Sequence, residues 1–245
     1  MMDPAILDAM RKAFPPVEMA DEQGLLCFGG DLRPERLLAA YSLGIFPWYD
    51  KEPLLWWSLD PRCILPLSAF HLPKRSQRTL KNHPFALTMD TAFSEVIVAC
   101  AAPRTDGGGT WITPAMQQAY CTLHTLGFAH SVEAWQDGEL VGGLYGVGLE
   151  RAFFGESMFH RRPEASRAAL AGLVAFLRLR NVVLLDCQQE TPHMMAMGAQ
   201  MVDQATYQAC LVEAGLGRGC SLSWKPWSEN TVFVYESSSW SEKSK

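Results

Sequence analysis

The sequence lacks the patterns of a secreted, membrane-inserted or zinc-stabilised protein. It has seven cysteines, an odd number, and no two of them form a C-x-x-C pair, which argues against a disulfide framework and a structural zinc site. No uncharged stretch approaches the roughly 20 residues that span a bilayer, and no basic flank precedes an apolar run at the N-terminus. We therefore expect a cytoplasmic protein with reduced thiols, no metal and no membrane contact.

Positive charge is also scarce in this chain. The formal net charge is −5, and a protein that coats nucleic acid needs a surplus of Lys and Arg. The one concentrated basic run holds Lys74, Arg75, Arg78 and Lys81. Any contact with RNA must therefore be local, and this run is the candidate for it. The alternative is that the run forms a solvated charged surface.

The sequence does contain ample material for a packed core, since 48% of its residues are hydrophobic. Residues 24–30 are typical of a short strand closed by glycines, and a helix that Asp31 caps and Gly44 ends should follow. Residues 45–67 are too rich in proline for a helix and too aromatic for a linker, which favours a packed, irregular segment with short strands.

The rest of the chain alternates helical and strand patterns. Two helices should flank a glycine-rich loop at 103–111, which we expect to be mobile or to approach a ligand closely. Further on, the patterns predict an antiparallel meander over 131–135, 139–145 and 151–159, a helix over 165–177, a buried strand over 182–185 and a helix over 204–214. This is the order of the acetyltransferase-like α/β fold, and the polar tail 236–245 should be disordered.

Two carboxylates interrupt apolar strands. Asp186 and Gln188 follow the buried run and share one face of the strand, and Glu156 and Met158 show the same spacing. A buried carboxylate is costly without a partner or a purpose, so these residues are candidates for one shared site. The alternatives are that Asp186 caps a turn or pairs with an arginine, and that Glu156 is a salt-bridged strand end.

Covalent catalysis is not indicated. The sequence has no G-x-S-x-G elbow, and its six histidines are scattered without metal-ligand spacing.

Several spaced motifs resemble those of the leucyl/phenylalanyl-tRNA-protein transferase family. The motifs are Gly29-Gly30-Asp31-Leu32, Gly44-Ile45-Phe46-Pro47-Trp48, Trp56-Trp57-Ser58, Gly109-Thr110-Trp111-Ile112, Leu140-Val141-Gly142-Gly143, Gly155-Glu156-Ser157-Met158-Phe159 and Asp186-Cys187-Gln188. The resemblance runs from about Phe14 to Gly215. It implies a small mixed N-terminal domain, 1–62, ahead of an acetyltransferase-like catalytic domain, 63–235.

The resemblance also implies a reaction and its substrates. Leu, Phe or Met would pass from aminoacyl-tRNA to the N-terminal Arg or Lys of an acceptor protein, which marks that protein for N-end-rule degradation. No cofactor is implied, because an activated ester needs only alignment, proton removal and stabilisation of the oxyanion. A monomer is expected.

Site residues follow from the matching motif positions. Asp186 and Gln188 match the reacting centre, with the carboxylate drawing the amine's proton through the amide, and the tRNA's terminal ribose is an alternative participant. Glu156 matches a further catalytic residue. Trp48 and Trp111 match the aromatics that hold the terminal adenosine, and the amino-acid pocket would be lined by Leu144, Met158, Leu170, Leu173 and Leu185. On pattern alone, these seven residues are typical of a core.

The sequence departs from the family's motifs at three positions, and two other functions are possible alternatives. Leu144 stands where the family commonly has methionine, His160 replaces a small polar residue and Arg167 replaces lysine. These departures bear on the shape of the pocket and on the contacts with the acceptor. An N-acetyltransferase of the same fold is one alternative, although residues 160–166 lack the glycine that a pyrophosphate-binding loop needs. A non-enzymatic RNA-binding module is the other.

Overall fold

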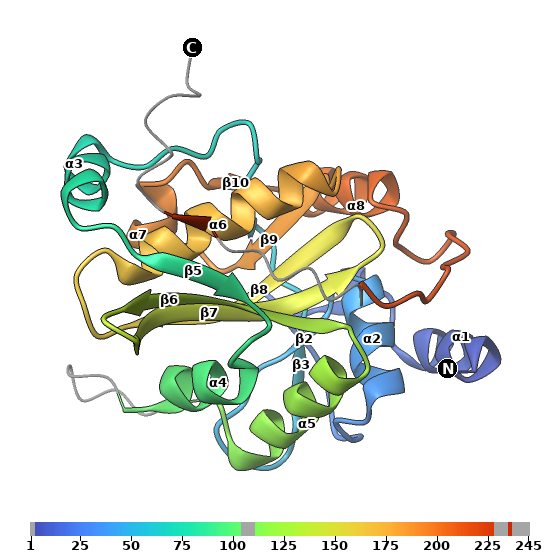
Figure 1. The fold of residues 1–245 in the computed structure, drawn as a ribbon. Coiled ribbons are helices and arrows are strands. Elements are labelled where there is room, and N and C mark those ends of the chain that lie inside the picture. The colour runs from blue at the N-terminus through green and yellow to red at the C-terminus, as the bar shows by residue number, and fades with distance from the viewer. Residues whose placement is uncertain (1–2, 104–110, 228–234, 237–245) are drawn as a thin grey trace.

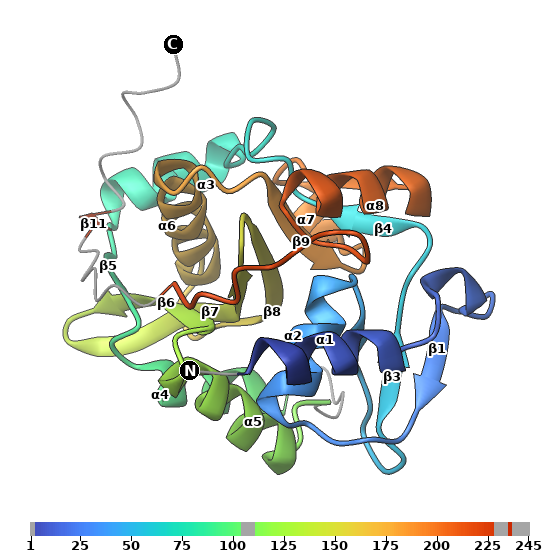
Figure 2. The same ribbon diagram turned by 90° about the vertical axis from the view of Figure 1, so that its right-hand side faces the viewer.

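The computed structural model describes residues 3–103, 111–227 and 235–236. A large mixed sheet runs through the middle of the molecule, with α6 on one face and α4 and α5 on the other (Figure 1). A small N-terminal layer packs against one end of this sheet (Figure 2). This arrangement confirms the expected α/β class with a small mixed N-terminal part.

The N-terminal layer is built from short elements. These are α1 (Pro4–Ala13), the 3-10 turn Val17–Met19, β1 (Leu25–Phe28), α2 (Pro34–Ser42), β2 (Phe46–Pro47) and β3 (Leu55–Trp57), with the strands in the order β1-β3-β2. The predicted cap of α2 was wrong, because the helix begins at Pro34 and the Asp31 carboxylate accepts the N–H of Arg33 instead. Gly44 does follow the helix with a φ of +76°, as expected.

The large sheet has the strand order β10-β4-β9-β8-β7-β6-β5-β11. Its strands are β4 (Arg62–Ile64), β5 (Ala86–Met89), β6 (Ala129–Gln136), β7 (Glu139–Leu149), β8 (Ala152–His160), β9 (Leu184–Gln188), β10 (Gln200–Val202) and β11 (Tyr235–Glu236). The meander β6-β7-β8 is confirmed, and Asp137 and Gly138 turn its first hairpin with positive φ angles. Only β8 and β9 pair in parallel among the described strands.

The helices that cover the large sheet arise from the periodic apolar patterns of the sequence. They are α3 (Lys74–Asn82), α4 (Phe93–Ala101), α5 (Pro114–Thr125), α6 (Ala165–Leu179), α7 (Pro192–Met195) and α8 (Gln204–Glu213). The small residues Ala165, Ala168 and Ala169 let α6 lie close to the strands, and Ala165 touches the backbone position of Gly142. The central part of α6 is buried from Leu170 to Val174.

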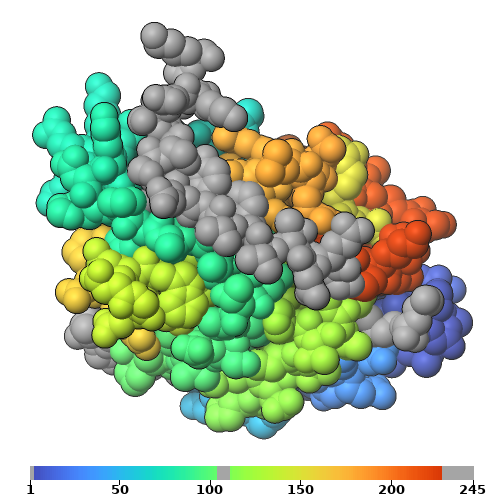
Figure 3. Space-filling model, viewed as in Figure 1, coloured from blue at the N-terminus to red at the C-terminus, as the bar shows by residue number. Residues whose placement is uncertain are grey.

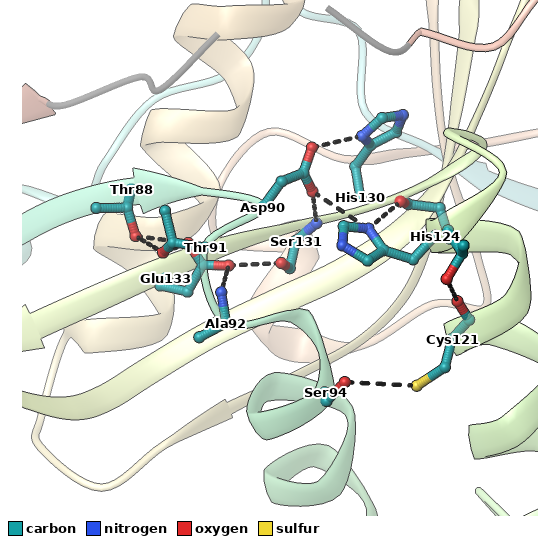
Figure 4. Close-up of polar contacts among 12 residues, drawn as sticks. Thr88, Asp90, Thr91, Ala92, Ser94, Cys121, His124, His130, Ser131 and Glu133 are labelled. Carbon is teal, nitrogen blue, oxygen red and sulfur yellow. Dashed lines mark hydrogen bonds and ion pairs between the residues drawn. The ribbon is translucent and has the colours of Figure 1, made fainter. Parts of the chain in front are cut away.

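Polar anchors fix the start of α4 to the sheet (Figure 4). The buried carboxylate of Glu133 accepts hydrogen bonds from the hydroxyls of Thr88 and Thr91 at 2.6 and 3.0 Å. Asp90 accepts from His130 Nδ1 at 2.7 Å and from the Ser131 N–H at 2.9 Å. The N–H of Ala92, the N-cap residue of α4, donates to the same Glu133 carboxylate at 3.4 Å, so the cluster ties the start of α4 to the sheet. The far end of the same helix borders the cavity described below.

Three expectations from the sequence concern element boundaries or residues outside the described ranges. The expected boundary at residue 62/63 runs through β4, and the division into two domains stays a prediction. The glycine-rich segment 104–110 lies outside the described residues. So do residues 237–245 of the expected tail, whereas Glu236 lies in β11. No helix in the described part of the chain is long and apolar enough to span a membrane.

Candidate active site

The site lies where β8 and β9 part. These strands pair only from Ala152 to Phe154, opposite Leu184 to Asp186, and the later residues of β8 have no such partners in β9. A bulge in the β7–β8 ladder at Gly155–Glu156 breaks the alternation of side chains along β8. A cavity of about 890 Å³ opens beside this point.

The five residues expected to form the amino-acid pocket all line this cavity. They are Leu144, Met158, Leu170, Leu173 and Leu185, and they come from two neighbouring strands, from β9 and from α6. All five pack in one apolar cluster beneath α6. The sequence patterns had identified them as core residues, and the structure shows that they form both a core and a cavity wall. This wall suits an apolar side chain.

Glu156 lines the same cavity but points to the other side of the sheet from Met158. Its carboxylate accepts hydrogen bonds from the hydroxyls of Tyr41 and Tyr120, at 2.7 and 2.9 Å, and from the Gln188 amide at 2.9 Å. Burial raises the pKa of Glu156 to about 7, although these three hydrogen bonds favour the ionised form and partly oppose the rise. Near neutral pH this group can therefore exist in either protonation state.

Asp186 is 0% exposed and is held by an arginine. Arg62 Nε and Nη2 donate to its two oxygens at 3.0 and 2.7 Å, and the Tyr207 hydroxyl donates at 2.7 Å. The guanidinium itself lies between the rings of Phe46 and Tyr207, 4.7 and 4.8 Å from their centres. Burial alone would lower the pKa of Arg62, but the charge of Asp186 keeps it above its ordinary value. Asp186 therefore pairs with an arginine, which was one of the two structural alternatives for this residue in the sequence analysis.

Gln188 joins the two carboxylates. Its backbone N–H donates to Asp186 at 2.8 Å while its side-chain amide donates to Glu156. The residue ends β9 with a φ of +58°, a backbone conformation that is uncommon for a residue with a side chain. Asp186 and Gln188 are not among the described residues that line the cavity, whereas Glu156 is. The chain Arg62–Asp186–Gln188–Glu156 thus leads from the interior to the cavity wall.

The two tryptophans expected at the terminal adenosine lie differently. Trp111 is half-buried and lines the cavity. Trp48 is 37% exposed, does not line it, and packs edge-on against Trp57 with ring centres 5.4 Å apart. The segments that carry them are neighbours, because the hydroxyls of Tyr49 and Thr113 lie 3.4 Å apart. A base between the two tryptophans remains a prediction.

The basic run forms most of α3. Lys74, Arg75, Arg78 and Lys81 are all exposed, and their spacing places them on one side of the helix. In Figure 3 the segment with α3, coloured teal, projects from the surface. The other side of the helix lies against the start of α6, where Arg167 donates to the Ser76 hydroxyl at 3.3 Å. No ion pair among the described residues involves these four cations.

Sequence reasoning missed the partners that hold the carboxylates. Tyr41 and Tyr120 fall on apolar helix faces and look like core residues, although a buried tyrosine hydroxyl needs a partner, and that need was the available signal. Arg62 and Tyr207 lie far from Asp186 in the chain, and nothing in their surroundings marks them. No group of three His, Cys, Asp or Glu side chains in the described part of the chain is arranged to hold a metal ion.

The sequence is similar to one family of known proteins over most of its length. The model of the leucyl/phenylalanyl-tRNA protein transferase family matches residues 64–212, and the model of that family's N-terminal domain matches residues 30–60. The chain is 59% identical over 189 residues to the leucyl/phenylalanyl-tRNA–protein transferase of Desulfatibacillum aliphaticivorans, covering 76% of this chain and 81% of that protein. It is 55% identical over 205 residues to the protein of the same name from Syntrophotalea carbinolica, covering 83% and 89%.

Proposed function

The chain belongs to the leucyl/phenylalanyl-tRNA protein transferase family, and from this premise we propose that it is an aminoacyltransferase. In this proposal a leucyl, phenylalanyl or methionyl group moves from its tRNA to the N-terminal Arg or Lys of an acceptor protein in the cytoplasm, marking the acceptor for degradation. The enzyme acts as a monomer. The observation that carries the proposal is one cavity that joins an apolar pocket, Glu156 and Trp111.

Each part of the donor has a matching part of the cavity. The amino-acid side chain would enter the pocket beneath α6, where Leu170 and Leu173 line the wall. The adenosine would stack on Trp111, and such stacking contributes about 1–3 kcal/mol per base without hydrogen bonds to it. Phosphates of the acceptor stem would meet the cations of α3, which lies beside the start of α6.

The reaction joins the acceptor's amine nitrogen to the ester carbonyl carbon. The carbon–oxygen bond to the ribose breaks, the amine gives up a proton and the ribose oxygen takes one. We assign the proton acceptor to the Glu156–Gln188 pair, because Glu156 reaches the cavity and its pKa of about 7 lies close to neutral pH. Alignment of amine and ester in the cavity supplies the rest of the acceleration.

Asp186 has a supporting part in this scheme. It is fully buried, and it accepts the backbone N–H of Gln188, whose side-chain amide donates to Glu156. We therefore propose that Asp186 acts on the reacting atoms through Gln188. A ribose hydroxyl of the tRNA that shuttles the proton is the alternative route.

The decisive experiment offers purified protein radiolabelled leucyl-tRNA together with peptides that begin with Arg, Lys or Ala. Label should appear in the Arg and Lys peptides and not in the Ala peptide. Transfer to none of the three peptides by folded protein would refute the proposal. An N-acetyltransferase would instead be stabilised against heat by acetyl-CoA, and an RNA-binding module would bind the tRNA without releasing the amino acid.

A further inference from the structure

Arg161 is an exposed arginine that the fold holds in one place. It follows the last residue of β8, and its backbone N–H donates to the Val141 carbonyl at 2.7 Å. Its Nη1 donates to the Leu140 carbonyl at 3.1 Å, and its guanidinium carbon lies 5.6 Å from the centre of the Phe159 ring. One side-chain hydrogen bond and one ring contact, on a backbone that is itself hydrogen-bonded, thus restrain a side chain that usually moves freely. A fixed guanidinium loses less entropy when it binds an oxyanion.

In the described part of the chain, no carboxylate lies close enough to Arg161 to form an ion pair with it. Apart from Glu156, Arg161 is the only Arg, Lys, Asp or Glu among the described residues that line the donor cavity. Among the described residues of that wall, Arg161 is therefore the one that carries a permanent positive charge.

Arg161 also lines a second, neighbouring cavity of about 520 Å³. That cavity is lined in addition by Arg162, Glu95 and Glu139, so its charges balance and it is less suited to an anion. The side of Arg161 toward the donor cavity is the more favourable one for a negative group.

We infer that Arg161 binds the 5′-phosphate of the donor's terminal nucleotide. This inference rests on the proposed function, which places the amino acid beneath α6 and the adenosine at Trp111. An adenosine at that position has one anionic group within its own length, the phosphate on its 5′ oxygen. The cations of α3 lie outside the residues that line the cavity. In the proposed function they meet phosphates further along the RNA. A guanidinium fits two phosphate oxygens at once.

The test compares two small donors that differ only in this phosphate. One is adenosine that carries leucine on its 3′ oxygen, and the other is adenosine 5′-monophosphate with the same ester. With the unaltered protein, the phosphate should lower the KM of the donor roughly tenfold, as expected for a hydrogen-bonded charge at a partly exposed site. In Arg161→Gln this gain should vanish, so that the two donors have nearly the same KM.

Two control variants localise the effect. Arg162→Gln and Arg78→Gln should each retain most of the gain, because neither side chain lines the donor cavity. Arg161→Lys should retain part of it, since the charge remains but the two-oxygen geometry does not. A gain that persists in Arg161→Gln, or that Arg162→Gln abolishes equally, would overturn the assignment.

The experiment distinguishes a failure of the proposed function from a failure of the role proposed for Arg161. If the unaltered protein transfers leucine from neither small donor nor from full tRNA, the proposed function is wrong. If it uses both small donors with the same KM, the function stands and the role of Arg161 is wrong. If Arg161→Gln changes only the KM of the acceptor peptide, Arg161 acts on the acceptor instead, which also refutes the inference.

Discussion

Replacing Asp186 by Ala should destabilise the fold as well as the reaction. The substitution leaves the guanidinium of Arg62, which is 1% exposed, without its counter-charge in the interior. Breaking a buried pair from one side costs about 3–5 kcal/mol, because an uncompensated charge remains. For a chain of this size each kcal/mol lowers the Tm by roughly 2–4 °C, so thermal unfolding should show a fall of roughly 10 °C.

A charge-free pair separates the two roles of Asp186. In Arg62→Met/Asp186→Asn the buried charge is gone, and the Asn carbonyl can still accept the Gln188 N–H. Much of the lost stability should return, giving a coupling energy of roughly 3 kcal/mol between the two positions in a double-mutant cycle.

Leucine transfer is then measured in the same proteins below their unfolding temperatures. If the charge of Asp186 helps the reaction through Gln188, the double variant should be stable yet slower by at least about tenfold, or 1.4 kcal/mol. Strictly additive stability effects would refute the account of the ion pair. Full activity in the stable double variant would refute any role in the reaction.

Three further predictions concern Glu156, Trp111 and the cations of α3. Folding raises the pKa of Glu156 from 4.5 to about 7, so between these pH values the folded state binds a proton that the unfolded state has lost. The free energy of unfolding should therefore fall by about 3 kcal/mol from pH 4.5 to pH 7. Melting curves of Glu156→Gln at the two pH values should lack this fall. Trp111→Ala should weaken the binding of an aminoacyl-adenosine mimic by about 1–3 kcal/mol, and an unchanged Kd would exclude stacking. Arg75→Ala/Arg78→Ala should flatten the slope of log affinity for full tRNA against log salt by up to roughly 0.7–0.9 per lost cation. The affinity for the mimic should not change, because the mimic is too short to reach α3. An unchanged slope with full tRNA would mean that these cations are surface charges without a role in binding.

The sequence predicted the order of elements well because local patterns determine them. Alternating and helical apolar spacing marked the meander, α6 and β9, and Asp137–Gly138 marked a turn that requires positive φ. The cap of α2 was misplaced by two residues, since Pro34 is a good first helical residue and Asp31 bonds the loop instead. End positions depend on such local competition.

The site was only partly predictable. Motif positions pointed to Glu156, Gln188 and the expected pocket leucines; the structure brings Gln188 into contact with Glu156 and places Glu156 and the leucines around one cavity. The bulge at Gly155–Glu156 turns Glu156 away from Met158, which simple alternation along a strand cannot foresee. Arg62 is 124 positions from Asp186, and only the pairing of β4 with β9 brings them into contact. Long-range pairing of this kind leaves no local trace in a sequence.

The hydrogen bonds of Tyr41 and Arg62 have a consequence for dissecting this protein into parts. Both residues belong to the first 62 positions, yet one donates to Glu156 and the other neutralises Asp186. A fragment that begins at Cys63 would retain every expected pocket leucine while losing a donor to each carboxylate. The N-terminal part is therefore a structural component of the proposed reaction centre. We expect such a fragment to regain transfer only when the missing segment is supplied with it, as in a split enzyme.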